Sequence, residues 1–313
     1  MFAVQFQRFG PPKVLTLGPA PEPHPGPHQV RIAVRTAAVS PVDLGLRAGS
    51  SPMSKNLALP HIPGVDAAGV IDEIGAEVTD YAVGDEVFGA VDVARLGGAS
   101  AQYAVLDFWT HKPHDMTWAE AGAAGTGIET ATRALDLLDI KKNMTLLVDG
   151  AAGGVGSIAV QLAVARGARV IGTARPDSHP FLRELGVEPV DYGHSLPARI
   201  RALTAAPVDR ALDVAGAGSL SELIEVTGTA ESVVTLADFK ASTYGVRLST
   251  GRIGGQPDGV HGLTSAIALA DKGRFRVPIR DTYPAHQAAQ AHATAARPPR
   301  RGKIVLDMAR TSY

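Results

Sequence analysis

One stretch of the sequence, residues 144–166, constrains the fold more than any other. A short apolar run at 145–148 passes through a cluster of glycines into a segment whose apolar residues recur at helical spacing. This order predicts a strand, a tight turn and a helix that is buried on one face. The glycines of the turn occupy positions 150, 153, 154 and 156.

A turn of this kind suits a phosphate ligand. Where Cβ atoms are missing, backbone N–H groups can approach a pyrophosphate held at the N-terminus of the following helix. The spacing of these glycines differs from the common G-x-G-x-x-G, so a purely structural turn is the alternative. Residues 169–174 are expected to form a second strand at the distance that a crossover requires. Two such units in series favour a parallel sheet that binds a dinucleotide.

Composition sets the broad class of protein. The chain has 313 residues, of which 45% are hydrophobic and 19% charged, and a formal net charge of −1. The length is comfortable for two domains, and the composition is that of an ordinary soluble globular protein. The charge balance suggests neither nucleic acid nor an anionic membrane as a partner. No apolar run is long enough to span a membrane, and residues 1–6 lack the features of a secretory signal. We therefore expect a cytoplasmic location.

Metal ligands are scarce in this sequence. The chain contains no cysteine, so it offers neither disulfides nor thiolates for a zinc ion or an iron–sulfur cluster. Two histidine pairs, His24 with His28 and His111 with His114, lie in proline-containing segments. We expect solvated loop histidines there rather than metal ligands, because no helix aligns them.

Two regions of different texture are visible along the chain. Up to about residue 110, short candidate strands are separated by proline and glycine, which predicts a compact, irregular β domain. These strands are expected at residues 1–6, 30–37, 67–74, 86–89 and 101–105. From about Gly122 the sequence becomes rich in alanine at helical spacing, and further strands are expected at 189–191, 211–214, 232–236 and 246–248. With the first two strands, these predict a doubly wound sheet of six parallel strands.

Several ordered motifs carry a resemblance to a known family. They are Ala-Ala-Val-Ser-Pro-Val-Asp-Leu-Gly-Leu-Arg-Ala-Gly at 37–49, Pro-His-Ile-Pro-Gly-Val-Asp-Ala-Ala-Gly-Val-Ile at 60–71, Val-Gly-Asp-Glu-Val-Phe-Gly at 83–89 and Gly-Lys-Ile-Val-Leu at 302–306. Together with the glycine turn, they resemble the medium-chain dehydrogenase/reductase superfamily over nearly the whole chain. The resemblance implies an α/β fold in which a Rossmann-type dinucleotide-binding domain at 122–254 joins a β-rich, GroES-like catalytic domain at 1–121 and 255–313.

The branch of that superfamily can be argued from the metal ligands. Zinc-dependent members hold the metal with cysteines and a histidine, but here Ser40 matches the first cysteine position. Gly64-Val65-Asp66 stands where those members have Gly-His-Glu. A catalytic zinc would therefore lack its ligands. The chain is similar to the zinc-independent quinone oxidoreductase branch.

The resemblance places Ser40, Asp43 and Gly45 at the substrate cleft. For Asp43 and Arg47 we expect a local ion pair rather than direct catalysis, since a carboxylate beside a cation is usually ionised and cannot donate a proton. Several relatives carry a tyrosine where this chain has Gly45, which leaves space for a bulky acceptor. The proton donor is consequently not identified, and water, the quinone's own oxygens and Tyr244 are the alternatives.

Cofactor contacts are implied at the turn and at the ends of several strands. The predicted cofactor-binding residues are Thr126, Ala152, Gly153, Gly154, Val155, Gly156, Thr173, Arg175, Ser178, Tyr192, Ala215 and Ala237. An ordinary strand-end aromatic is the alternative for Tyr192, and a solvated turn is favoured over a phosphate contact for the arginine- and proline-rich run at 297–301.

Residues 173–178 decide between the two nicotinamide cofactors. An acidic residue at the end of the second strand would bind the adenosine ribose and repel a 2′-phosphate. Here Arg175 offers a cation with several donors and Ser178 a hydroxyl, which favours NADPH. Asp177 argues the other way, but it follows Pro176, where the chain turns away from the strand.

The resulting hypothesis is an NADPH-dependent, zinc-independent reductase that transfers hydride to a quinone or an α,β-unsaturated carbonyl (enone). Without a Lewis acid, hydride is best delivered to an acceptor that is already polarised by conjugation. An enoyl-thioester reductase of fatty-acid or polyketide tailoring and a non-catalytic NADPH-binding, redox-sensing protein are the alternatives. The exposed edge expected at 244–249 and the resemblance together suggest a homodimer.

Overall fold

The structure, a computed structural model, describes residues 1–92, 95–298 and 301–309. The chain folds into two compact units, of which the first comprises Met1–Thr126 and Ile267–Tyr313 and the second Gly127–Ala266. The expected domain boundaries lay at 121/122 and 254/255. The arginine- and proline-rich run at 297–301 lies partly outside the described residues.

The first unit is built on strands that are mostly antiparallel. They are β1 (Phe2–Gln5), β2 (Thr16–Pro19), β3 (Val30–Val39), β4 (Asp66–Ile74), β5 (Glu86–Val91), β6 (Tyr103–His111), β13 (Ile279–Pro284) and β14 (Lys303–Asp307). Six of them form a sheet in the order β13-β14-β3-β4-β5-β6, and β3 also pairs with β6. The long strand β3 is central because it pairs with β14, β4 and β6, always antiparallel.

Short helices complete this unit. They are α1 (Pro41–Ala48), α2 (Trp118–Ala121) and α9 (Ala288–Ala295), with 3₁₀ turns η1 (Pro12–Val14), η2 (Pro52–Asn56) and η7 (Ala285–Gln287). Helix α1 begins directly after β3, where Pro41 occupies the first helical position and removes an N–H that would otherwise lack a partner. It ends at Gly49, whose φ of 74° is left-handed and accessible to glycine at little cost.

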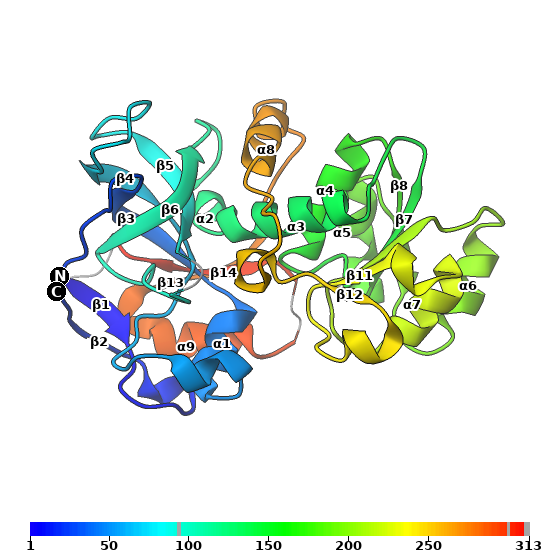
Figure 1. Ribbon diagram of the computed structural model, residues 1–313, viewed down its shortest axis with the longest axis horizontal. Coiled ribbons are helices and arrows are strands. Elements are labelled where there is room, and N and C mark those ends of the chain that lie inside the picture. The colour runs from blue at the N-terminus through cyan, green and yellow to red at the C-terminus, as the bar shows by residue number, and fades with distance from the viewer. Residues whose placement is uncertain (93–94, 299–300, 310–313) are drawn as a thin grey trace. The chain divides into compact units, whose positions relative to one another are not determined.

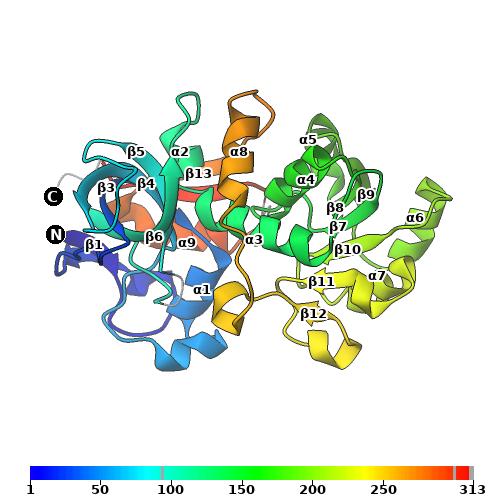
Figure 2. The ribbon, with the colours of Figure 1, turned by 45° about the horizontal axis from the view of Figure 1, so that its top comes forward.

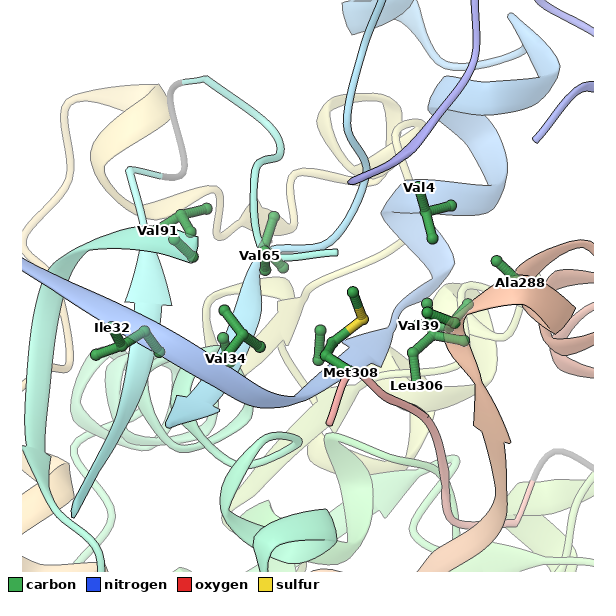
Figure 3. Packing of buried hydrophobic residues seen from close by; sticks show 14 of the residues in the cluster. Val4, Ile32, Val34, Val39, Val65, Val91, Ala288, Leu306 and Met308 are labelled. Atoms are coloured by element: carbon green, nitrogen blue, oxygen red, sulfur yellow. The ribbon is translucent and has the colours of Figure 1, made fainter. Parts of the chain in front are cut away.

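The core of the first unit follows from the alternation of apolar residues along β3. Val30, Ile32 and Val34 are buried, and they pack with residues of β4, β5, β14 and α9 (Figure 3). Complete burial of such side chains contributes roughly 1.5–3 kcal/mol each. From Ala37 onward β3 is buried on both faces, so this end of the strand carries the chain into α1 within the interior.

The second unit is a six-stranded sheet in the order β12-β11-β10-β7-β8-β9, and every pairing in it is parallel. Its strands are β7 (Thr145–Asp149), β8 (Arg169–Ala174), β9 (Glu188–Asp191), β10 (Arg210–Asp213), β11 (Val233–Thr235) and β12 (Arg247–Leu248). The expected doubly wound sheet is confirmed.

Helices connect the strands of the second unit. They are α4 (Gly156–Ala165), α5 (His179–Glu184), α6 (Leu196–Leu203) and α7 (Leu220–Thr227), with 3₁₀ turns η3 (Pro176–Ser178), η4 (Ala230–Ser232), η5 (Ala241–Tyr244) and η6 (Gly251–Gly254). Two further helices, α3 (Gly125–Leu137) and α8 (Gly262–Ala270), cross the boundaries between the units. Helices α4 and α5 lie on one side of the strands and α6 and α7 on the other (Figures 1 and 2).

The register of the second sheet aligns the ends of its strands. Asp213 at the end of β10 pairs with Asp149 at the end of β7, and Ala174 of β8 pairs with Asp191 of β9. The loops that follow these strands therefore leave the sheet along one edge, where ligands bind in open parallel sheets. Within the described ranges, no helix is long and apolar enough to cross a membrane.

Candidate cofactor and substrate sites

The glycine turn between β7 and α4 can be built only with glycine at two of its positions. Gly150 has a φ of 87°, in the left-handed region. A Cβ atom on Gly156 would lie 2.2 Å from the Gly150 carbonyl oxygen, so the helix approaches the end of the strand too closely for any side chain. Backbone conformation at Gly150 and close packing at Gly156 therefore explain why glycine occupies these two positions.

Unused backbone donors gather at this turn. The N–H groups of Ala152, Gly154, Val155 and Gly156 donate to no acceptor among the described residues, whereas Gly153 N–H donates to Gly150 O over 3.1 Å. These groups precede or open α4, whose N-terminus carries partial positive charge. The donors fit a pyrophosphate, and the turn brings the predicted residues 152–156 together.

Thr173, a predicted cofactor contact, is buried, and its side chain hydrogen-bonds to residues at the start of the glycine turn. Its hydroxyl donates to the Asp149 carboxylate and accepts from Gly150 N–H over 3.0 Å. The other Asp149 oxygen accepts from the Ser219 hydroxyl over 2.6 Å. The side chain of Thr173 therefore holds the first glycine in place, and sequence reasoning missed its partners Asp149 and Ser219.

A second buried carboxylate shapes the loops after β10 and β11. Asp213 is 0% exposed. Its Oδ1 accepts from the N–H groups of Ala215 (3.0 Å) and Gly216 (2.8 Å), and its Oδ2 from the Thr235 hydroxyl (2.7 Å). Burial raises the pKa of Asp213, these hydrogen bonds oppose the shift, and the Asp149 charge adds to it.

The network of Asp213 extends to the next loop. Thr235 Oγ1 accepts from the N–H groups of Ala237 over 3.2 Å and Asp238 over 3.0 Å. The N–H groups of the predicted contacts Ala215 and Ala237 are therefore both engaged within the protein. Only their carbonyl oxygens remain for a ligand, and a carbonyl accepts the N–H of an amide such as that of nicotinamide.

The residues predicted to select the cofactor lie at the ends of β8 and β9. The Arg175 side chain is exposed and makes no hydrogen bond or ion pair with any residue that the structure describes. The Ser178 hydroxyl donates to Asp177 Oδ1 over 3.0 Å. Tyr192 directly follows β9 and is 54% exposed. Arg175 is thus available to a ligand, while Ser178 already has a partner.

The first unit holds a buried polar cluster where α1 begins. Asp43 is fully buried, and its carboxylate accepts from the N–H groups of Ser40 over 2.7 Å and Gly64 over 2.9 Å. Burial raises the pKa of Asp43 to about 6. The two N–H donors lower it, the Asp66 charge raises it further and the Lys303 charge lowers it.

Asp66 and Lys303 complete this cluster. The Asp66 carboxylate accepts from the N–H (2.5 Å) and the hydroxyl (2.6 Å) of Thr126. Lys303 Nζ lies 3.5 Å from Asp66 Oδ2 and 3.5 Å from the Ser40 hydroxyl oxygen. Sequence reasoning named Ser40, Asp43 and Thr126 but not Asp66 or Lys303 as site residues, although each stands inside one of the recognised motifs.

The expected ion pair between Asp43 and Arg47 is wrong. Both Asp43 oxygens accept from backbone N–H groups, because the residue sits in the first turn of α1. Arg47 lies one helical turn later, and its buried Nε and Nη1 have no hydrogen-bond partner among the described residues. Gly45, on the same helix, has an ordinary φ and room for a Cβ atom, which would lie 3.5 Å from the nearest atom, Ser51 Cβ.

The histidine pairs noted in the sequence do not converge. His24 hydrogen-bonds to Glu73 over 3.0 Å, and His114 is exposed and contacts Asp115. Across residues 1–92, 95–298 and 301–309, no group of three or more His, Cys, Asp or Glu side chains is arranged to hold a metal ion.

Known proteins match this chain along its whole length. The family described as "Alcohol dehydrogenase GroES-like domain" matches residues 26–114, and the family described as "Zinc-binding dehydrogenase" matches residues 154–249. A quinone oxidoreductase of Pseudomonas aeruginosa is 29% identical over 324 residues, which cover 97% of this chain and 98% of that protein.

The chain belongs to the medium-chain dehydrogenase/reductase superfamily, in its quinone oxidoreductase branch. Human quinone oxidoreductase is 38% identical over 178 residues, covering 56% of this chain and 53% of the human protein. The solved structure of the quinone oxidoreductase from Coxiella burnetii superposes with a TM-score of 0.84 over 98% of this chain and 99% of that one, at 28% identity.

Membership of this superfamily makes the protein an oxidoreductase with a nicotinamide cofactor, NAD or NADP. The expected fold, a GroES-like domain joined to a Rossmann-type domain, is confirmed.

Proposed function

We propose that this protein is an NADPH-dependent, zinc-independent reductase that transfers a hydride to a quinone or an α,β-unsaturated carbonyl compound, and that it acts in the cytoplasm as a homodimer. The observation that carries the proposal is the turn at 150–156, where several N–H groups have no acceptor among the described residues, near strand ends that leave the sheet along one edge. The alternative of a purely structural turn does not account for these donors.

The choice of NADPH rests on Arg175. This exposed guanidinium lies directly after β8 and has no partner in the part of the chain that the structure describes. It suits the 2′-phosphate that distinguishes NADPH from NADH. Asp177, the residue that argued for NADH, accepts a hydrogen bond from Ser178. Within this proposal Tyr192 lies against the adenosine end, at the adjacent strand.

The side chains at the zinc-ligand positions of the family support a metal-free reaction. Val65 stands in place of an imidazole and is packed in the apolar core (Figure 3). Ser40 stands in place of a thiolate, and the Lys303 ammonium lies 3.5 Å from its oxygen. A positive charge at that distance opposes a divalent cation, so the cluster both lacks the ligands and repels the metal.

The chemistry then follows from what this chain supplies. When bound, the reduced nicotinamide supplies a hydride. The turn binds the pyrophosphate, and the carbonyls of Ala215 and Ala237, fixed through Asp213, orient the nicotinamide amide. The Ser40 hydroxyl, held by Lys303, serves as a donor to the oxygen on which charge develops in a conjugated acceptor. The proton that completes the reduction has no assigned donor in this scheme.

The homodimer is proposed to form through the edge of the second sheet. Strand β12 ends the sheet order and so has a neighbour on one side only. An unpaired strand edge invites pairing with a second copy across a two-fold axis. Sedimentation of a monomer at micromolar concentration would remove this part of the proposal without affecting the others.

The decisive test is oxidation of NADPH and of NADH by the purified protein with a chelator present, against quinones, enones and enoyl thioesters. We expect turnover with NADPH on quinones or enones. Turnover on enoyl thioesters alone would favour the thioester reductase. Tight NADPH binding without turnover on any acceptor would favour a binding protein, and equal or better turnover with NADH would contradict the role given to Arg175.

A further inference from the structure

Helices α1 and α9 of the first unit lie next to each other, with an arginine and a histidine buried on them (Figures 1 and 2). Arg47, in the last turn of α1, is 5% exposed, and His292 of α9 is 1% exposed. Helix α9 also packs against η1 and β3, so this cluster lies inside the fold of the first unit.

Both side chains have buried polar atoms without a hydrogen-bond partner among the described residues. These atoms are Arg47 Nε and Nη1 and His292 Nδ1. Asp43, one helical turn before Arg47 on α1, has both oxygens engaged by backbone N–H groups of Ser40 and Gly64. A buried donor without a partner is rare in folded proteins, and a buried charge without one is rarer still.

Arg47 alone carries charge in this cluster. Burial lowers the pKa of Arg47, and no carboxylate contributes a shift in the opposite direction. Burial, with the neighbouring Arg47 charge, lowers the pKa of His292 to about 3, so its ring is neutral near pH 7. A neutral imidazole whose Nδ1 carries its proton is a hydrogen-bond donor.

Two kinds of partner would satisfy these donors. Water accepts hydrogen bonds but leaves the guanidinium charge uncompensated in a region of low dielectric constant. A small anion accepts the same hydrogen bonds and also neutralises the charge. The apolar surroundings, in which Ala288, Ala291 and Leu46 are buried, favour a weakly hydrated monovalent anion over phosphate or sulfate.

We propose that Arg47 and His292 form a structural binding site for a small halide ion, chloride under ordinary conditions. The ion joins α1 to α9 by accepting from both side chains, and it replaces the carboxylate that the sequence led us to expect. Because α1 also carries Ser40 and Asp43 at its other end, the ion stabilises the helix on which the polar cluster is built.

The test is thermal unfolding at constant ionic strength, with sodium gluconate replaced stepwise by sodium chloride. Ligand linkage predicts that Tm stays nearly constant while chloride is below its dissociation constant, and above it rises by about 2 °C for each tenfold increase in chloride. Arg47→Met should abolish the rise. Arg201→Met is the matched control, because Arg201 is exposed and paired with Glu225 over 3.1 Å, and it should retain the rise.

A readout on the unaltered protein covers the case in which Arg47→Met does not fold. Crystals grown in sodium bromide should show an anomalous peak within hydrogen-bond distance of the Arg47 guanidinium. A Tm that does not depend on chloride, or a rise that is equal in wild type and Arg47→Met, would overturn the proposal, as would bromide-grown crystals without such a peak. Water would then satisfy these donors.

Discussion

Each unit of this protein buries a pair of aspartates, and the two pairs have different surroundings. In the second unit, Asp149 and Asp213 end neighbouring strands and accept only from hydroxyl and N–H groups. In the first unit, Asp43 and Asp66 also accept from N–H groups, but the Lys303 ammonium lies beside Asp66.

The difference indicates different uses for the same residue type. Hydroxyl and N–H donors fix loop geometry without introducing charge, which suits the backbone scaffold of a cofactor site. A buried ammonium beside two carboxylates makes a charged cluster that responds to pH and opposes a bound cation. Asp213 is therefore a positioning residue, and the Asp43–Asp66–Lys303 cluster is an electrostatic one.

Asp213→Ala removes the buried carboxylate that holds the loops of the second unit, and we expect it to lower stability more than any other variant proposed here. Two backbone N–H groups and the Thr235 hydroxyl would lose their acceptor inside the protein. We expect a loss of about 3–5 kcal/mol in the free energy of unfolding, since each unsatisfied buried group costs about 1–3 kcal/mol. Denaturant unfolding measures it, and any folded fraction should show a raised KM for the nicotinamide cofactor.

Asp213→Asn is the matched control for that variant. The amide keeps one oxygen for the two N–H groups, but the Thr235 hydroxyl, which already accepts from two N–H groups, loses its acceptor. With one unsatisfied group instead of three, the loss should fall to about 1–3 kcal/mol. Equal losses for the alanine and asparagine variants would mean that packing, rather than hydrogen bonding to the loops, explains the effect.

The pH dependence of stability tests whether the buried cluster of the first unit is electrostatic. The pKa of Asp43 is about 6 in the folded protein against 3.8 for a free carboxyl, so the folded state binds the proton more tightly. Stability from this group is fully present below pH 3.8 and is lost as the pH rises to about 6. The difference corresponds to about 3 kcal/mol.

Comparison of wild type with Asp43→Asn isolates that contribution. Asparagine does not titrate, so the destabilisation caused by the substitution should be larger near pH 4 than near pH 7, by about 2 kcal/mol. Chemical unfolding at the two pH values measures it. A cost of substitution that does not change with pH would mean that Asp43 titrates normally and that the cluster holds it ionised.

Arg175→Ala tests the cofactor end of the second unit and should have a smaller energetic effect. Loss of a charged hydrogen bond of about 2 kcal/mol would raise the KM for NADPH about thirtyfold and leave the KM for NADH unchanged. Arg199→Ala is a control, because Arg199 instead bonds to carbonyls of the loop after β9. Equal changes for both cofactors would show that Arg175 does not contact the 2′-phosphate.

Gly45→Tyr should change stability least, by less than about 1 kcal/mol, because the helix position is unstrained and has space. We expect it to reduce kcat/KM for bulky acceptors while leaving small ones unaffected. Gly45→Ala separates helix propensity from bulk in the same assays. Full activity of the tyrosine variant on large quinones would contradict the idea that Gly45 leaves space for them.

Local sequence patterns predicted the strands of the second unit well. Strand β8 was expected at 169–174, where it is found, and the other five strands lie within a few residues of their predicted positions. Buried parallel strands read as contiguous apolar runs, and the glycines mark the turn that follows the first of them. In the first unit, β2 and β13 were missed, since Thr16–Pro19 is short and partly exposed and Ile279–Pro284 contains several polar residues.

The order of elements, the glycine turn and the absence of thiolate ligands can be predicted without a structure, because each depends on residues that are close together or on composition alone. Which polar groups meet depends on how the chain folds. Asp149 and Ser219 are 70 residues apart, and Ser40 and Lys303 are 263 apart. The fold also gave Asp43 other partners than Arg47, with which an ion pair was expected. A side chain chooses among all the partners that the fold brings near it, and for Asp43 the backbone N–H groups of Ser40 and Gly64 lay closer.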